Sequence, residues 1–194
     1  MKLDKQTSKV RIVFDASARY KGMSLNDCTH QGPSLQQDIV KILTRFRKNR
    51  VAIICDIAEM YMNIEISNED RNFFRFLWRN PDDLSDICVF EFNRLIFGGN
   101  ASPFLAQFVS RENAEKYRED YPRACETVLL STYMDDSLDS VSDTKDGIDL
   151  YRQLSELWKK ADMSARKWLS NDPKVLEQIP ENQRSVNIRL GENS

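Results

Sequence analysis

The sequence has few of the residues that mark linkers, metal cages or histidine-based active sites. Six glycines and six prolines among 194 residues are too few for a linker or a low-complexity protein. The single histidine, His30, is the one candidate for a histidine base, and it stands in a stretch that is typical of a surface loop. The cysteines form no C-x-x-C pair, which argues against zinc and favours reduced, mostly buried thiols at Cys28, Cys55, Cys88 and Cys125.

Long hydrophobic runs are also absent. No apolar segment approaches the roughly 18 residues that a membrane span needs, and the first five residues lack the apolar stretch of a secretory signal. Hydrophobic residues make up 41% of the chain and the net charge is only −2, so the chain is not typical of disorder. We therefore expect a folded intracellular domain that is not secreted.

The small net charge conceals an uneven distribution. Residues 1–50 carry 11 Lys and Arg against 4 Asp and Glu, whereas residues 51–194 carry 17 against 26. A basic first quarter followed by an acidic remainder indicates one surface for an anion and another for cations. The alternative is ordinary solvated charge.

The hydrophobic pattern predicts helices and strands without strict β-α-β alternation. A continuous apolar run predicts a buried strand at 51–57, and residues 61–66 alternate as if they pair with it. Amphipathic segments predict helices at 34–49, 102–118 and 144–161. Short β-rich runs predict further strands at 10–14, 73–78, 89–92, 127–132 and 137–141. This order predicts an α+β fold with helices on one face of an antiparallel sheet.

Acidic residues stand at the ends of two predicted strands. Asp56 lies near the end of the strand 51–57, and Asp135 and Asp136 lie side by side at the expected tip of a hairpin. Adjacent carboxylates repel each other and lose solvation unless a cation neutralises them. Oxygen ligands without histidine or cysteine suit Mg²⁺ or Mn²⁺, and three converging carboxylates can hold two ions for in-line phosphoryl transfer. The alternative is a simple turn dipeptide, because aspartate is common in turns.

Five segments, in order along the chain, resemble the motifs of reverse transcriptases. They are K-V-R-I-V-F-D at 9–15 with L-N at 25–26, D-I-A-E-M-Y at 56–61, F-G-G-N-A-S-P at 97–103 followed by Gln107, Y-M-D-D at 133–136, and K-W-L-S-N at 167–171. A four-residue string such as Y-M-D-D arises by chance on the order of once in a thousand chains of this length. Five such motifs in the family's order make coincidence implausible.

The resemblance implies a polymerase palm with an RRM-like or ferredoxin-like core, partial fingers and no thumb. It implies that Asp56 and Asp135 bridge two Mg²⁺ (or Mn²⁺) ions, with Asp136 in support. It also implies further roles: Lys9 and Arg11 grip the triphosphate, Tyr61 excludes the 2′-hydroxyl of a ribonucleotide, Gln107 contacts template or nucleotide, and Lys167 protonates the leaving pyrophosphate. The fingers are expected at about 1–33 and 67–97, and the palm at 34–66 and 98–180.

The function that the resemblance implies is template-directed DNA synthesis on an RNA or DNA template, within a retrotransposon polyprotein. Three segments are most similar to the Pao/BEL class of long-terminal-repeat retrotransposons: R-I-V-F-D-A-S-A-R-Y-K-G-M-S-L-N-D at 11–27, Q-G-P-S-L at 31–35 and R-K-W-L-S-N at 166–171. The implied partners are a template-primer and dNTPs, and the protease, RNase H and integrase domains of such polyproteins are absent from this chain. A cytoplasmic location, in a virus-like particle, is expected.

Three other interpretations stay open at this point. An RNA-dependent RNA polymerase shares the acidic pair, but Tyr61 and Tyr133 argue against it. A truncated or domesticated remnant would fold and bind nucleic acid without catalysis; the intact acids argue against it and the expected lack of a thumb argues for it. A nucleotidyl cyclase-like palm has no use for the segment 97–107. In addition, Asp162 stands where relatives tend to have glycine, which leaves the placement of Lys167 open.

Overall fold

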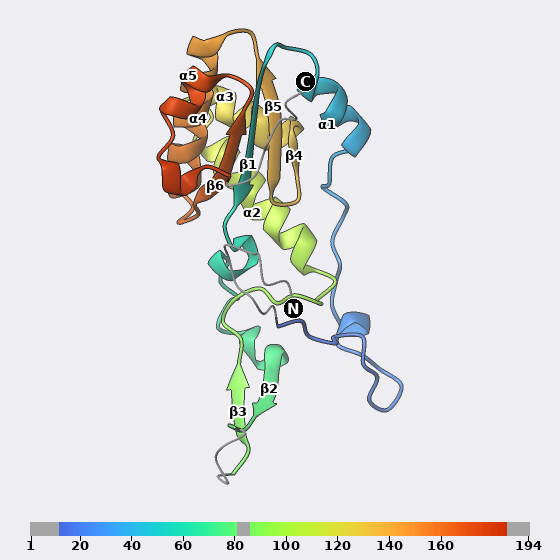
Figure 1. Ribbon diagram of the computed structural model, residues 1–194. Coiled ribbons are helices and arrows are strands. Elements are labelled where there is room, and N and C mark those ends of the chain that lie inside the picture. Colours follow the sequence, from blue (N-terminus) through green and yellow to red (C-terminus); the bar gives the residue numbers. More distant parts are fainter. Residues whose placement is uncertain (1–11, 81–85, 186–194) are drawn as a thin grey trace, which may run out of the picture. The chain divides into compact units, whose positions relative to one another are not determined.

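The computed structural model describes residues 12–80 and 86–185, and the chain falls into two compact units (Figure 1). One unit comprises Met1–Pro33 and Tyr61–Leu105, and the other comprises Ser34–Met60 and Ala106–Ser194. The expected division between fingers and palm after residue 33 coincides with a boundary between these units. The other expected divisions, after residues 66 and 97, differ from the observed ones, after residues 60 and 105. The assignment of either unit to fingers or palm stays a prediction.

The unit that contains Ser34–Met60 is built on a four-stranded antiparallel sheet in the order β4-β5-β1-β6. The strands are Val51–Ile57 (β1), Thr132–Tyr133 (β4), Asp136–Val141 (β5) and Ala165–Ser170 (β6). Strand β1 is central and its burial alternates, so that Val51, Ile53, Cys55 and Ile57 face the core while the residues between them are half-buried. One face of the strand is therefore left partly accessible.

Helix α4 (Thr144–Lys159) packs against the buried face of this sheet. Asp143 caps its start by accepting a hydrogen bond from the amide of Asp146 at 2.9 Å. Gly147 allows the close approach, because a Cβ atom there would lie 3.2 Å from Val51 Cγ1 and 2.8 Å from Val175 Cγ2. The fully buried side of the helix consists of Leu150, Leu154, Leu157 and Trp158.

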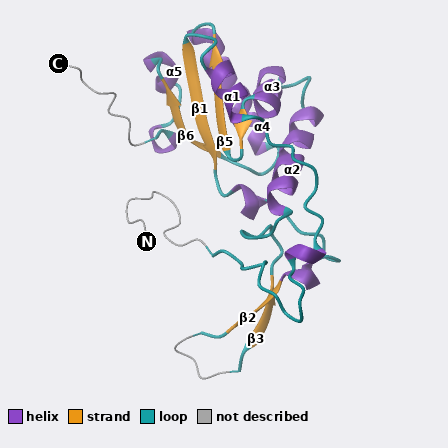
Figure 2. Ribbon diagram, turned by 90° about the vertical axis from the view of Figure 1, so that its right-hand side faces the viewer, coloured by secondary structure: helices purple, strands orange, loops and turns teal. Residues whose placement is uncertain are grey.

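Three shorter helices complete this unit, together with the part of α2 (Ser102–Lys116) that follows Leu105. They are α1 (Ile39–Phe46), α3 (Pro122–Leu130) and α5 (Pro173–Glu177). Helices α3 and α4 lie on the same side of the sheet (Figure 2). The antiparallel sheet with helices packed on it confirms the predicted α+β class.

The other unit contains a two-stranded ribbon, β2 (Arg75–Trp78) and β3 (Cys88–Glu91), paired antiparallel with Arg75 opposite Glu91. Aromatic rings hold its base together: the ring of Phe14 lies edge-on to Phe76 and to Phe92, with centroids 5.6 and 4.8 Å apart. Most other large side chains of the ribbon are exposed, including Leu77 and Val89.

The loop before α2 is held by residues from the start of the chain. The amide of Phe14 donates to the carbonyl of Phe97 at 2.8 Å. The side chain of Asn26 donates to the Gly98 carbonyl at 3.2 Å and accepts from the Asn100 amide at 2.9 Å. Gly98 has φ +104°, and a Cβ atom there would lie 1.9 Å from the Phe14 carbonyl oxygen. The structure thus joins two of the sequence motifs and explains why glycine stands at 98.

Several predicted elements are wrong. Residues 61–66 form no strand; a 3₁₀ turn spans Met60–Asn63, and both edges of β1 are already occupied by β5 and β6. The predicted strand 127–132 is the end of α3 followed by β4, because so short a run has no periodicity that separates a helix from a strand.

Other boundaries are shorter than expected. Helix α1 begins after Asp38, whose side chain caps it, and not at Ser34. Residues 12–14 form no strand, and residues 10 and 11 lie outside the described part of the chain. All four cysteines are free, and only Cys55 and Cys125 are buried, so the expectation of mostly buried thiols is half right. In the described residues, no helix is both long and apolar enough to cross a membrane.

Candidate active site

The Y-M-D-D segment forms a hairpin turn at one end of the sheet. Tyr133 on β4 pairs with Asp136 on β5, so Met134 and Asp135 make the turn. Met134 has φ +56°, a conformation that costs a residue with a side chain about 1–2 kcal/mol. The amide of Ile57 donates to the carbonyl of Asp135 at 2.8 Å, which fixes the turn against β1. The prediction of a hairpin that carries the two adjacent acids is confirmed.

Asp56 lies directly opposite Asp136. The two are cross-strand partners in the β1–β5 register, which continues from Val51 opposite Val141. Cross-strand partners share a face of the sheet, with Cβ atoms about 4.5–5.5 Å apart. This is the half-buried face of β1, away from the core that Cys55 and Ile57 enter. The sheet therefore brings one acid of each motif side by side.

Two cations of strand β6 bind the Asp56 carboxylate. Arg166 Nε donates to Oδ1 at 3.0 Å, and Lys167 Nζ donates to Oδ2 at 2.8 Å. The Asp56 side chain is only 17% exposed, against 27% for Arg166 and 39% for Lys167. Lys167 therefore reaches the acidic site, as its motif predicts, although Asp162 replaces the expected glycine. Asp162 adopts φ +54°, the conformation that a glycine would take most readily.

The pKa of Asp136 is raised by its surroundings. Burial of its carboxyl group raises the pKa of Asp136, the neighbouring charges of Asp135 and Asp56 raise it further, and Lys167 lowers it. The Asp136 side chain is still exposed overall, so solvent screens part of this effect. On the opposite face, burial raises the pKa of the Cys55 thiol to about 12, so this neighbour stays protonated. The acids repel one another, and additional positive charge would relieve that repulsion.

The donor chemistry fits a hard divalent cation. Carboxylate oxygens are the ligands that Mg²⁺ and Mn²⁺ prefer. Asp56 and Asp136 share the half-buried face at one end of the sheet, and Asp135 lies in the adjoining turn. In the described residues, however, no three acidic, histidine or cysteine side chains already gather closely enough to hold an ion. Because both oxygens of Asp56 accept hydrogen bonds from cations, a metal ion would have to compete for them.

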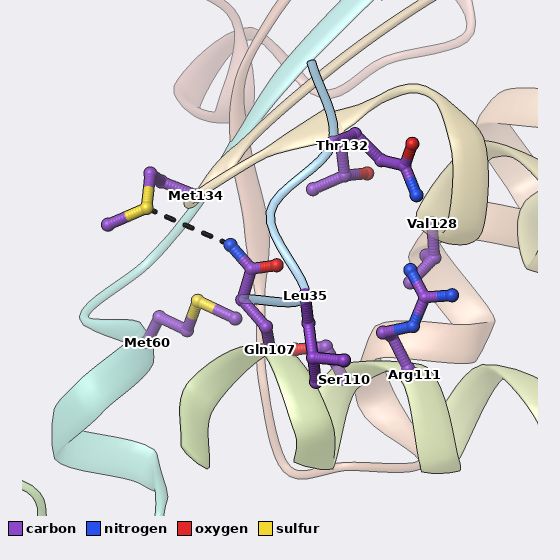
Figure 3. Close-up of a pocket in the computed structure, with 9 residues that line it drawn as sticks. Leu35, Met60, Gln107, Ser110, Arg111, Val128, Thr132 and Met134 are labelled. Carbon is purple, nitrogen blue, oxygen red and sulfur yellow. Dashed lines mark hydrogen bonds between the residues drawn. The ribbon is translucent and has the colours of Figure 1, made fainter. Parts of the chain in front are cut away.

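A small pocket lies beside the turn (Figure 3). Gln107, on α2, points toward the turn and donates from Nε2 to the Met134 sulfur at 3.8 Å and to Gln36 Oε1. The remaining lining residues are Leu35, Gln37, Met60, Ser110, Arg111, Val128 and Thr132. Gln107 is thus the predicted binding residue that directly contacts the Y-M-D-D turn.

The remaining predicted site residues are Tyr61, Lys9 and Arg11. Tyr61 belongs to the unit that contains Tyr61–Leu105, where its ring stacks on Phe97 with centroids 4.9 Å apart. Lys9 and Arg11 lie outside the described residues. Their roles stay predictions.

Arg166 is the one residue at the site that sequence reasoning missed. It directly precedes the K-W-L-S-N motif, so the sequence places two adjacent cations at 166 and 167. Strand periodicity hides it, because neighbouring residues of a regular strand point to opposite faces. Only the irregularity of β6, described below, lets both cations reach one carboxylate.

Acids of this kind are the ligands that enzymes of metal-assisted phosphoryl transfer use. The chain matches the family described as reverse transcriptase (RNA-dependent DNA polymerase) over residues 3–167, and it belongs to that family. Its activity class is RNA-directed DNA polymerase, a nucleotidyltransferase that binds template-primer and dNTPs and uses divalent metal ions. A search of curated proteins finds no matching relative.

Proposed function

We propose that this chain carries out template-directed DNA synthesis on an RNA or DNA template by two-metal nucleotidyl transfer. The observation that supports it is the placement of Asp56 opposite Asp136, next to a turn that presents Asp135. We propose that Asp56 and Asp135 bridge the ions and that Asp136 supports them. When bound, such ions activate the primer 3′-hydroxyl and neutralise the leaving pyrophosphate.

The chain's own residues have distinct tasks in this proposal. Lys167, held 2.8 Å from Asp56 Oδ2, is the candidate donor of a proton to the leaving group. Gln107 contacts template or nucleotide from the wall of the pocket beside Met134. Tyr61 selects deoxyribonucleotides by excluding a 2′-hydroxyl, and Lys9 and Arg11 bind the triphosphate.

The biological context is part of the same proposal. The similarity of residues 11–27 to Pao/BEL elements supports an origin in a retrotransposon polyprotein. An element of that kind replicates in cytoplasmic virus-like particles, which is the location we propose. The two units would then correspond to fingers and palm.

Primer extension tests the proposed reaction. The assay uses an RNA template, a DNA primer, dNTPs and Mg²⁺ or Mn²⁺, with wild type, Asp135→Asn and the control Asp120→Asn. Asp120 is an exposed acid outside the site, so its variant should extend as wild type does. We expect Asp135→Asn to lose at least about a hundredfold in rate with its fold retained, because it removes a charge that stabilises the transition state.

A second candidate is a folded remnant that binds nucleic acid without catalysis. The observation in its favour is that Asp56 is already paired with two cations. Extension by wild type that is lost in Asp135→Asn would exclude this alternative. Template binding without extension, unchanged by added Mg²⁺ or Mn²⁺, would support it and refute the proposed reaction.

A further inference from the structure

A bulge in strand β6 places two consecutive side chains on one carboxylate. Ile54 pairs with Leu169, and Asp56, two residues further along β1, pairs with Arg166, which is three residues away from Leu169 on β6. Strand β6 therefore contains one extra residue between these pairs. Lys167 occupies the extra position and has φ +52°. Bulges of this kind turn a side chain away from its regular face and are common beside active sites. Here the bulge lets Arg166 and Lys167 both reach Asp56.

Each oxygen of the Asp56 carboxylate accepts a hydrogen bond from one of the two cations. Arg166 Nε takes Oδ1 and Lys167 Nζ takes Oδ2. Arg166 is the more buried of the two cations, and its guanidinium keeps its charge at any physiological pH, whereas a lysine is a flexible point charge. The pairing also offsets the repulsion between Asp56 and Asp136, which face each other across β1 and β5.

We propose that Arg166 is a positioning residue that holds and neutralises Asp56 until a divalent cation takes over this carboxylate. The inference rests on the proposed two-metal function and deepens it. Arg166 then competes with the cation, so it weakens cation binding in the absence of nucleic acid. It also keeps the acidic edge of the sheet stable when no cation is present.

Cation titration tests the competition. Isothermal titration with Mg²⁺ or Mn²⁺, without nucleic acid, compares wild type with Arg166→Gln, Arg166→Lys and Arg152→Gln. Removing a competing charge should tighten binding in Arg166→Gln by about tenfold. Arg166→Lys keeps the charge and should stay close to wild type. Arg152 is an exposed arginine on α4, so its variant controls for the loss of one positive charge.

Thermal unfolding gives a second measurement that does not depend on activity. We expect Arg166→Gln to unfold at a lower temperature than wild type without a cation, and to gain more from saturating Mg²⁺, because tighter binding stabilises the folded state more. NMR of the Arg166 Nε–H in the wild-type protein needs no variant: its resonance should shift as Mg²⁺ is added, when the carboxylate leaves it.

The outcomes separate this inference from the proposed function. The same titration is made on Asp135→Asn: if wild type binds the cation and Asp135→Asn does not, the metal site stands. Equal cation affinity in wild type and Arg166→Gln, or an Arg166 Nε–H resonance unmoved by Mg²⁺, would then refute the competition alone. Absence of cation binding in every variant would overturn both proposals.

Discussion

Replacement of Gly98 by alanine tests how the motif before α2 is held. Gly98 has φ +104°, and a Cβ atom there would lie 1.9 Å from the Phe14 carbonyl oxygen. The positive φ alone costs alanine about 1–2 kcal/mol. Relief of the clash requires Phe14 to move, with an overpacking cost of about 1–3 kcal/mol. Loss of the Phe14 to Phe97 hydrogen bond adds about 1 kcal/mol, so we expect Gly98→Ala to destabilise its unit by about 3–6 kcal/mol.

Gly22 supplies the matched control. It lies in the same unit with φ +86°, but a Cβ atom there would have nothing within 4 Å. Gly22→Ala should therefore cost only the conformational part, about 1–2 kcal/mol. The assay is urea unfolding of both variants, with hydrogen exchange at the Phe14 amide as a local probe. Exchange should accelerate strongly in Gly98→Ala and little in Gly22→Ala.

The comparison of the two glycines isolates the steric contribution. Equal unfolding free energies for Gly98→Ala and Gly22→Ala would refute the reasoning, since the crowding at Phe14 would then contribute nothing. A destabilised Gly98→Ala with unchanged exchange at Phe14 would place the damage elsewhere and refute the assigned cause.

Three further predictions concern the site. Because the pKa of Asp136 is raised, its ionisation costs the folded state stability as pH rises above 3.8. Without cations, Asp136→Asn should therefore stabilise the fold at pH 7 by at most about 0.5 kcal/mol, since the side chain is exposed, and this gain should vanish below pH 3.8. A gain that persists at low pH in urea unfolding would contradict this reasoning. Tyr61→Ala should admit ribonucleotides in primer extension, and unchanged sugar selection would remove Tyr61 from that role. Gln107→Leu should lower kcat/KM for dNTP by roughly tenfold while unfolding shifts little, because it loses a polar contact beside Met134; a wild-type kcat/KM would argue against Gln107 as a binding residue.

The sequence predicted those parts of the fold whose pattern is local. The apolar run 51–57 and the amphipathic run 144–161 became β1 and α4, since each carries its own periodicity or continuous apolar character. The prediction for the segment 127–132 failed for the complementary reason: the run is too short for its pattern to separate a helix from a strand. Residues 61–66 alternate, but β5 and β6 had already taken both edges of β1, which is a fact of topology that no local pattern contains.

The candidate site was predictable where motifs mark it and hidden where backbone geometry makes it. Asp56, Asp135 and Asp136 stand in recognisable strings, and their proximity follows from the hairpin. Arg166 joins them only because β6 gains one residue relative to β1; in a regular strand Arg166 and Lys167 would point to opposite faces. A bulge of this kind depends on pairing with a strand about 110 positions away in the chain, as the Arg166 to Asp56 bond shows.

The two-residue turn has a consequence for how this chain tolerates change in length. Met134 and Asp135 alone separate the paired residues Tyr133 and Asp136, and the next side chain, Ser137, is 2% exposed. A single inserted or deleted residue in β5 would exchange the faces of all the side chains beyond it. A carboxylate would then enter the core at the level of Ser137 and a hydroxyl would face Asp56. Substitutions around the turn are therefore graded in effect, whereas a one-residue change of length in β5 moves every side chain beyond it to the other face.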